Sequence, residues 1–311
     1  MSKTAKAFAP AAISSFFQIH DTQNGKPISN LEKVGARGGG FGLEKGVHTR
    51  VSVQEAEKNC INIYINSKHS LEARTTKEVV ETILAKTAAN YNVTVEHQIE
   101  VPIGSGFGTS AGGALTAGLA LKDALGLPLT YNQIGKIAHI AEIKCQTGLG
   151  TVSSLTFSGG CVLVVEPGAP GICQIDRIPI TADYVLVAGV VELKVSKKPI
   201  LTSPEMKKEI NRYGKQTMKK ILLVPTLKNF LDCCWEFSQK AGFATEKTRR
   251  LIEAAKDAGA VGAAQNMIGE AAHALVIEEN ASKVAEAFKH VLTSKQVIVS
   301  KIDFQGARLT R

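Results

Sequence analysis

The chain has 311 residues, of which 44% are hydrophobic and 21% are charged, and its formal net charge is +9. These values are typical of a globular protein with a sizeable core, built as one large domain or as two lobes. No run of about 18 apolar residues predicts a membrane span, and no secretory signal is recognisable at the N-terminus. We therefore expect a cytoplasmic protein whose six scattered cysteines are reduced.

The positive charge does not by itself indicate a nucleic-acid-binding protein. The lysines are spread along the chain, and the densest group, between Lys207 and Lys220, is typical of the solvated face of a helix. Aromatic residues make up only 5% of the chain, and no platform for stacking bases is evident. We expect small anionic ligands, with no nucleic acid and no membrane as partners.

The first half of the chain is predicted to alternate strands and helices. Residues 59–65 and 93–101 place apolar side chains at every second position, which predicts strands with one buried face. Residues 76–90 and 110–125 have apolar side chains at three- and four-residue steps, which predicts helices. A capping box at Thr130–Gln133 predicts the start of a further helix that ends near residue 144.

The second half is predicted to be richer in helix. We expect short strands at 161–166 and 184–191, a linker at 194–204, helices from 204 to 258, further helical structure over 261–277 and 282–292, and a closing strand at 296–302. The fold class is therefore α+β with two lobes, residues 1–195 and residues 196–311.

A glycine-rich loop joins the strand at 93–101 to the helix that follows. Five of the residues from 104 to 113 are glycine and three are serine or threonine. Such a loop, at the start of a helix, points backbone N–H groups at an anion, and phosphate suits it best. No lysine follows Gly108 as in a Walker A loop, and the glycines are spaced too tightly for a dinucleotide-binding turn. The alternative is a plain glycine-rich turn.

The sequence of this loop resembles a family signature. Residues 102–111, Pro-Ile-Gly-Ser-Gly-Phe-Gly-Thr-Ser-Ala, resemble the P-x-G-x-G-L-G-S-S-A motif of the GHMP kinases, which are ATP-dependent kinases of small metabolites. Residues 7–17 resemble the N-terminal motif of that superfamily, and residues 258–269 resemble its C-terminal motif more weakly. Residues 35–49 and 147–150 are most similar to the archaeal pantoate kinases. The resemblance implies a two-lobed GHMP kinase fold whose N-terminal lobe is like ribosomal protein S5.

The resemblance also implies where ATP and Mg²⁺ bind. The residues implied to hold ATP are Pro102, Gly104, Ser105, Gly106, Phe107, Gly108, Thr109, Ser110 and Ala111. The Ser110 hydroxyl and the Glu142 carboxylate are implied to bind Mg²⁺, because a hard cation prefers such oxygens. Glu142 is alternatively a carboxylate on a helix surface. His139, one turn earlier, either orients Glu142 or simply packs.

Two positions depart from the family pattern. Thr151 stands where many members carry an acidic catalytic residue, and Ala12 stands where a basic or imidazole side chain is usual. Threonine is not a base at neutral pH. Three explanations remain. The one we favour is that positioning of the reactants and Mg²⁺ suffice for phosphoryl transfer. Alternatively, Asp21, His20 or Glu142 takes over the role of the missing side chains, or the activity is lost or changed.

A small hydroxy acid such as pantoate needs a group that binds its carboxylate. Arg37, with Gly38 and Gly39 beside it and Ser14 and Ser15 as hydroxyl partners, is the candidate set. Alternatively, Arg37 is a solvent-facing hairpin residue. Three functions follow: a pantoate kinase of archaeal coenzyme A biosynthesis, another GHMP kinase acting on a mevalonate phosphate or homoserine, or a non-catalytic nucleotide-binding protein. GHMP kinases often dimerise, so the resemblance leaves a homodimer open.

Overall fold

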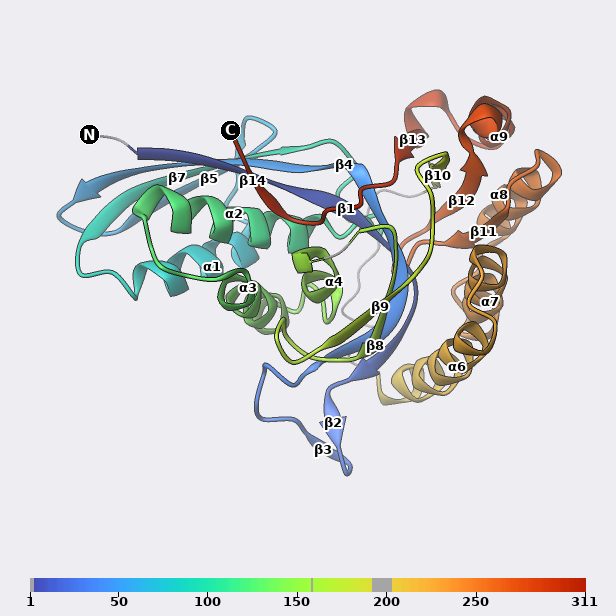
Figure 1. Cartoon of the computed structure of the whole chain (residues 1–311), viewed down its shortest axis with the longest axis horizontal. Coiled ribbons are helices and arrows are strands. Elements are labelled where there is room, and N and C mark those ends of the chain that lie inside the picture. The colour runs from blue at the N-terminus through green and yellow to red at the C-terminus, as the bar shows by residue number, and fades with distance from the viewer. Residues whose placement is uncertain (1–2, 158, 192–202) are drawn as a thin grey trace.

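A long antiparallel ribbon runs through the middle of the molecule. The computed structural model describes residues 3–157, 159–191 and 203–311. Strand β1 (Lys3–His20) pairs with β4 (Gly35–Ala56) from Lys3 opposite Val53 to His20 opposite Gly35. The short strands β2 (Thr22–Gln23) and β3 (Lys26–Pro27) form the hairpin between them. The ribbon reaches from the large N-terminal sheet to the helices of the C-terminal lobe (Figure 1).

The large sheet is built on this ribbon. Its strand order is β14-β1-β4-β7-β5-β6. Strand β8 pairs with the N-terminal part of β4, and β9 pairs with β8. Only the β5–β7 pair is parallel among the pairs of this sheet that the described residues form. The further strands are β5 (Cys60–Ile65), β6 (Lys68–His69), β7 (Asn90–Ile99), β8 (Cys161–Glu166), β9 (Gln174–Ile178) and β14 (Arg308–Thr310).

Four helices cover one face of the large sheet (Figure 1). They are α1 (Arg74–Leu84), α2 (Thr109–Leu125), α3 (Tyr131–Cys145) and α4 (Thr151–Phe157). Helix α2 is the central one and is buried on nearly all sides. A Cβ atom at Gly118 would lie 2.8 Å from Ile134 of α3, and one at Gly112 would lie 3.1 Å from Val47 of β4. The glycines that lower the helix propensity of α2 therefore allow its neighbours to approach closely.

The C-terminal lobe has a smaller antiparallel sheet with its own helices. The strand order is β11-β12-β10-β13, and helices α8 and α9 pack against this sheet. Helix α6 packs against the ribbon, and α7 packs against both β11 and the ribbon. The strands are β10 (Tyr184–Val190), β11 (Gly262–Gln265), β12 (Ala271–Ile277) and β13 (Val297–Lys301). The helices are α6 (Pro204–Leu223), α7 (Leu227–Lys240), α8 (Glu246–Asp257) and α9 (Ala281–Lys289).

An aromatic cluster joins the ribbon to the C-terminal helices. The rings of Phe16 and Phe41, from β1 and β4, lie 6.2 Å and 5.5 Å from the ring of Phe230 in α7. The ring of Phe237, about two turns further along the same face of α7, lies 6.3 Å from that of Phe16. All four side chains are almost completely buried. Burial of such large rings in edge-to-face contact is a strong apolar interaction, so the two lobes share one continuous core.

The predicted α+β class is confirmed, but the prediction of helix over 261–277 is wrong. This segment forms the hairpin of β11 and β12. Both of its strands are buried on both faces, apart from the last residue of β12. A short apolar run of this kind lacks the alternation that marks a half-buried strand, so its sequence does not distinguish a strand from a buried helix. The predicted helix over 282–292 corresponds to α9, and the closing strand to β13.

The chain passes between the two sheets more than once. Strand β10 precedes the expected boundary at 195/196 yet pairs with β12 and β13, and β14 follows that boundary yet pairs with β1. The boundary itself and nearly all of the expected linker at 194–204 lie outside the described residues. A division of the chain at that point therefore stays a prediction.

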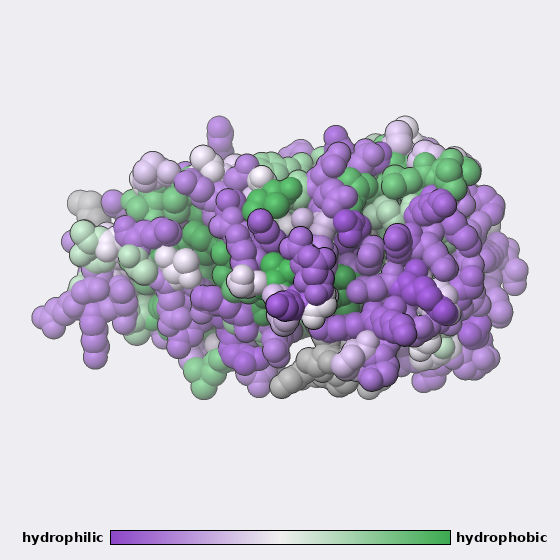
Figure 2. Space-filling model, turned by 90° about the horizontal axis from the view of Figure 1, so that it is seen from below, coloured by the Kyte–Doolittle hydropathy of each residue, from purple (hydrophilic) through white to green (hydrophobic). Residues whose placement is uncertain are grey.

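The surface agrees with the scattered charges of the sequence. Hydrophilic side chains cover most of the face seen in Figure 2, and hydrophobic ones gather in separate patches between them. Within residues 3–157, 159–191 and 203–311, no helix combines the length and the apolar character needed to cross a membrane.

Two glycines, Gly38 and Gly40, allow β4 to lie close against β1. A Cβ atom at Gly40 would overlap the carbonyl oxygen of Ile13, whereas one at Gly42 would have no neighbour nearer than 3.6 Å. We therefore expect Gly40→Ala to lower the free energy of unfolding by about 1–3 kcal/mol, the usual effect of overpacking. Gly42→Ala, in the same strand, is the matched control and should change it little. Urea unfolding of both variants measures the difference, and equal small effects would contradict the close packing.

Candidate active site

The glycine-rich loop connects β7 to the first turn of α2. Gly104, Gly106 and Gly108 have φ angles of 87°, 81° and 62°, in the region that favours glycine. Helix α2 begins at Thr109, directly after the loop, and no side chain caps its N-terminus. The first backbone N–H groups of a helix have no partner within the helix. This end of α2 therefore presents donors and partial positive charge to an anion.

Not every side chain of the loop faces outward. Phe107 and Ala111 belong to the hydrophobic core, and Ser105 is completely buried. Pro102, Thr109 and Ser110 are partly exposed. The buried side chains fix the shape of the loop, while its backbone and the hydroxyl groups of Thr109 and Ser110 remain near the surface.

Three distant segments of the chain meet at this loop. The Ala12 N–H of β1 donates a hydrogen bond to the Phe107 carbonyl over 2.9 Å. A Cβ atom at Gly108 would lie 2.8 Å from the Thr151 methyl group and 3.1 Å from the Ala12 Cβ. On the other side, a Cβ atom at Gly106 would lie 2.9 Å from the Asn266 Cβ. The two positions that depart from the family pattern, 12 and 151, thus lie side by side next to the loop.

Ser110 and Glu142 are linked by two threonines. The Ser110 hydroxyl donates to Thr75 Oγ1 over 3.3 Å, and Thr75 Oγ1 lies 3.0 Å from Thr147 Oγ1. The Thr147 hydroxyl donates to Glu142 Oε1 over 2.9 Å. The Glu142 side chain is only 3% exposed and packs against Gly148. The alternative that Glu142 is a surface carboxylate is therefore wrong.

His139 has a partner of its own and makes no described contact with Glu142. Its Nε2–H donates to the Val34 carbonyl over 2.8 Å, which ties α3 to the chain just before β4. Burial lowers the pKa of the imidazole, and the hydrogen bond to Val34 opposes this only in part. The geometry favours the packing alternative for His139.

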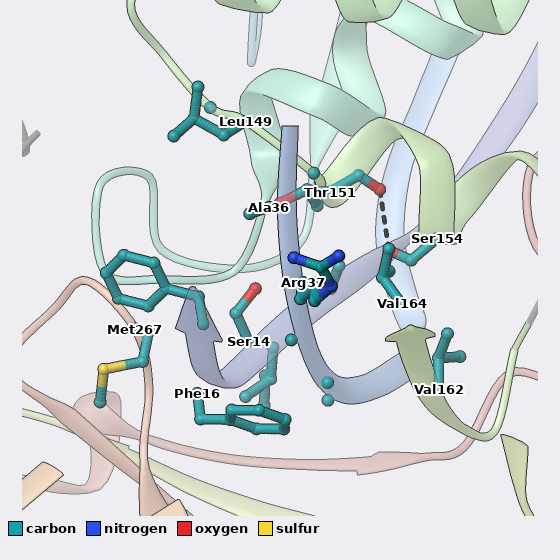
Figure 3. A pocket seen from close by; sticks show the side chains of 18 of the residues that line it. Ser14, Phe16, Ala36, Arg37, Leu149, Thr151, Ser154, Val162, Val164 and Met267 are labelled. Carbon is teal, nitrogen blue, oxygen red and sulfur yellow. Dashed lines mark hydrogen bonds between the residues drawn. The ribbon is translucent and has the colours of Figure 1, made fainter. Parts of the chain in front are cut away.

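A cavity of about 110 Å³ lies beside the loop, between β1, β4 and the start of α4 (Figure 3). Its walls are mainly glycine and apolar side chains, and its polar side chains are Ser14, Arg37, Thr151 and Ser154. The Ser154 hydroxyl donates to the Thr151 carbonyl over 2.9 Å. Among the lining residues that the structure describes, Arg37 is the one ionisable side chain and none is a carboxylate.

Arg37 lies at the edge of the cavity and is held there by β8. Its Nε–H donates to the Val165 carbonyl over 3.0 Å, and its terminal NH₂ group lies 2.7 Å from Glu166 Oε2. The Arg37 side chain is 26% exposed and that of Glu166 is 56% exposed. Arg37 therefore is not a freely solvated hairpin residue, and its ion pair is largely in water. Gly38 and Gly39 follow it along the same wall.

Ser14 and Ser15 point in opposite directions, because successive side chains of a strand face opposite sides. Ser14 lines the cavity, whereas Ser15 is completely buried and its hydroxyl lies 2.9 Å from His273 Nε2. His273 Nδ1 lies 2.8 Å from Asn266 Oδ1, so the ring donates to the amide oxygen and accepts from Ser15. Burial lowers the pKa of His273 to about 3, so the ring is neutral near pH 7. The structure thus separates Ser15 from the other candidate substrate residues.

Of the residues considered as substitutes for the missing acid, two lie elsewhere. Asp21 forms an ion pair with Lys207 of α6, and neither Asp21 nor His20 lines the cavity. Glu142 does not line it either, but Gly148, which packs on the Glu142 carboxylate, does. Within the described part of the chain, no group of three or more histidine, cysteine, aspartate or glutamate side chains is arranged to hold a metal ion.

Comparisons with known proteins agree with this architecture. The model of the GHMP kinases N terminal domain matches residues 74–159. The pantoate kinase of Methanocaldococcus jannaschii is 33% identical over 84% of this chain and 89% of the relative, and that of Thermococcus kodakarensis is 30% identical over 90% of each. A solved structure described as a phosphotransferase related to the CoA biosynthesis pathway is 25% identical over 99% of each chain, with a TM-score of 0.84.

The chain therefore belongs to the GHMP kinase family, whose members use ATP. Both of the relatives named above are pantoate kinases, and each is matched over most of its length.

The opposite orientations of Ser14 and Ser15 lead to a testable difference. Ser15→Ala leaves the buried His273 Nε2 without a donor, which should lower the free energy of unfolding by about 1–3 kcal/mol. Ser14→Ala should leave that free energy nearly unchanged and instead raise KM for the phosphoryl acceptor. Urea unfolding and steady-state kinetics on both variants measure this, and a larger acceptor KM for Ser15→Ala than for Ser14→Ala would contradict the assignment.

Proposed function

We propose that this protein is an ATP-dependent pantoate kinase, which converts pantoate to 4-phosphopantoate for coenzyme A biosynthesis. The observation that carries the proposal is the cavity beside the glycine loop. Among the described residues that line it, Arg37 is the one cationic side chain and none is a carboxylate. Such a cavity suits a small apolar acid. The similarity to two pantoate kinases over most of the chain supports the same acceptor.

The glycine loop and the start of α2 would bind the phosphates of ATP. The residues in this role are those from 102 to 111, with backbone N–H groups and the hydroxyls of Thr109 and Ser110 as donors. The loop belongs to the N-terminal part of the chain, residues 1–195. The segment around Asn266, from residues 196–311, contacts the loop at Gly106 and would hold the loop from the other side.

Ser110 and Glu142 would hold Mg²⁺ together with oxygens of ATP. One hydroxyl and one carboxylate fit this cation, which prefers oxygen ligands and commonly takes most of its ligands from phosphates and water. When bound, Mg²⁺ supplies charge neutralisation on the phosphate oxygens. Since the described residues form no cluster of three metal-binding side chains, a cation at this site depends on the nucleotide.

Arg37 would bind the carboxylate of pantoate. Its present partner, Glu166, is more than half exposed, and an ion pair of this kind contributes only about 0–1 kcal/mol. A substrate carboxylate can therefore replace Glu166 at little cost. Leu149, Val162 and Val164 line the cavity and would contact the two methyl groups of pantoate (Figure 3).

The transfer itself would rely on positioning more than on a base. The bond between the γ-phosphorus and the bridging oxygen breaks, the acceptor oxygen bonds to that phosphorus, ADP leaves, and the hydroxyl proton is lost. Thr151 lies at the expected place beside Gly108 but is not a base at neutral pH. Positioning of the two reactants and charge neutralisation account for most of the rate enhancement of phosphoryl transfer.

A coupled assay of ADP release tests the proposal. The purified chain is given ATP, Mg²⁺ and, separately, pantoate, mevalonate, a mevalonate phosphate or homoserine. Turnover should be fastest with pantoate. A higher kcat/KM with another acceptor would replace pantoate by that acceptor, and ATP binding without turnover on any of them would support a non-catalytic nucleotide-binding protein.

Arg37→Gln should raise KM for pantoate about 10- to 100-fold, since a charge-assisted hydrogen bond contributes about 1.5–3 kcal/mol. The KM for ATP should stay within about twofold of its original value. Glu166→Gln is the matched control, because it removes the competing carboxylate and leaves the guanidinium in place; its KM for pantoate should be equal or lower. An unchanged pantoate KM in Arg37→Gln would remove Arg37 from the acceptor site.

A further inference from the structure

The hydroxyl chain from Ser110 through Thr75 and Thr147 to Glu142 has a fixed direction. A carboxylate can only accept, so the hydroxyl of Thr147 must donate, to Glu142 Oε1 at 2.9 Å and towards the Glu142 carbonyl at 3.4 Å. Each hydroxyl has one proton. Thr75 must therefore donate to Thr147, and Ser110 must donate to Thr75.

This direction determines how Ser110 presents its oxygen. The single proton of Ser110 is directed at Thr75, so the lone pairs of its oxygen are left for other partners. At the far end of the chain, Thr147 fixes one oxygen of a carboxylate that is 3% exposed. Two side chains that are neither charged nor part of the glycine loop thus contribute to the orientations of both groups.

The two threonines are held at helix ends, Thr75 in the first turn of α1 and Thr147 just after α3. Thr75 is the second residue of α1, and Thr76 beside it bonds to the buried His97 at 3.1 Å. Thr147 follows α3, and its backbone N–H donates to the Glu142 carbonyl over 3.0 Å, which closes the end of that helix. Both threonines are thus fixed independently of any ligand.

We propose that Thr75 and Thr147 are positioning residues for the divalent cation, which act by orienting the Ser110 hydroxyl and the Glu142 carboxylate. This inference rests on the proposed function, in which Ser110 and Glu142 bind that cation. The threonines themselves transfer no proton and contact no phosphate in this arrangement. They supply the outer hydrogen bonds that commonly determine how well a metal ligand works.

The test compares Thr75→Val and Thr147→Val with Thr76→Val. Valine keeps the shape of threonine and removes the hydroxyl. Thr76 is the matched control, because it is adjacent to Thr75, each of the two side chains is 5% exposed, and the hydroxyl of Thr76 bonds to His97 instead. Thermal unfolding establishes that each variant is folded before binding is measured.

The readout is the affinity for a non-hydrolysable ATP analogue with Mg²⁺ and with EDTA, together with Mn²⁺ binding followed by electron paramagnetic resonance. In Thr75→Val and Thr147→Val, the metal-dependent affinity should fall about 10- to 100-fold, while the affinity in EDTA stays unchanged. Thr75→Ser and Thr147→Ser should restore it. Thr76→Val should keep the original metal dependence.

Ser110→Ala separates failure of this inference from failure of the proposed function. If Ser110→Ala loses the metal-dependent affinity and both threonine variants keep it, the inference is overturned and the cation site remains. If Ser110→Ala itself keeps the metal-dependent affinity, the assignment of Ser110 to the cation is overturned. An equal loss of affinity with Mg²⁺ and with EDTA in the threonine variants would show a merely structural role and would also overturn the inference.

Discussion

The close pairing of β1 with β4 is the constraint on which the rest of the structure depends. The two strands stay paired along nearly their whole length, with bulges at Pro10/Ala11 and at Ser14/Phe16. Gly38 and Gly40 have no side chains, which removes the atoms that would push these two strands apart. Because β1 contributes Ser14 to the cavity and β4 contributes Arg37, this pairing sets the distance between the groups that would meet the acceptor.

Much of the fold and part of the site could be predicted from local sequence. The glycine loop between a strand and a helix, the capping box at Thr130 and the closing strand near 297 all depend on residues close together in the chain, and all are found. The hairpin over 262–277 was missed because burial on both faces erases the periodicity on which such predictions depend.

The remaining parts of the site depend on contacts between distant residues. The partnership of Ser15 with His273 and Asn266 joins residues about 250 positions apart, and no local pattern indicates it. The same holds for Thr75 and Thr147, which are 72 positions apart and lie at the start of α1 and just after the end of α3. Sequence resemblance supplied Ser110 and Glu142, but the hydroxyl groups between them follow only from the packing of α1 against α2 and α3.

The pairing of β14 with β1 has a consequence for how the chain acquires its fold. Lys6 lies opposite Thr310, so these partners are separated by about 300 residues. A ribosome synthesises β1 early and β14 much later, and in the interval the outer edge of β1 has no partner strand. Unpaired edges invite pairing with other chains, and contacts between distant residues form slowly. Completion of the N-terminal sheet is therefore a late event in biogenesis, and a nascent chain that stalls before β14 exposes an edge that a chaperone or a second chain can occupy.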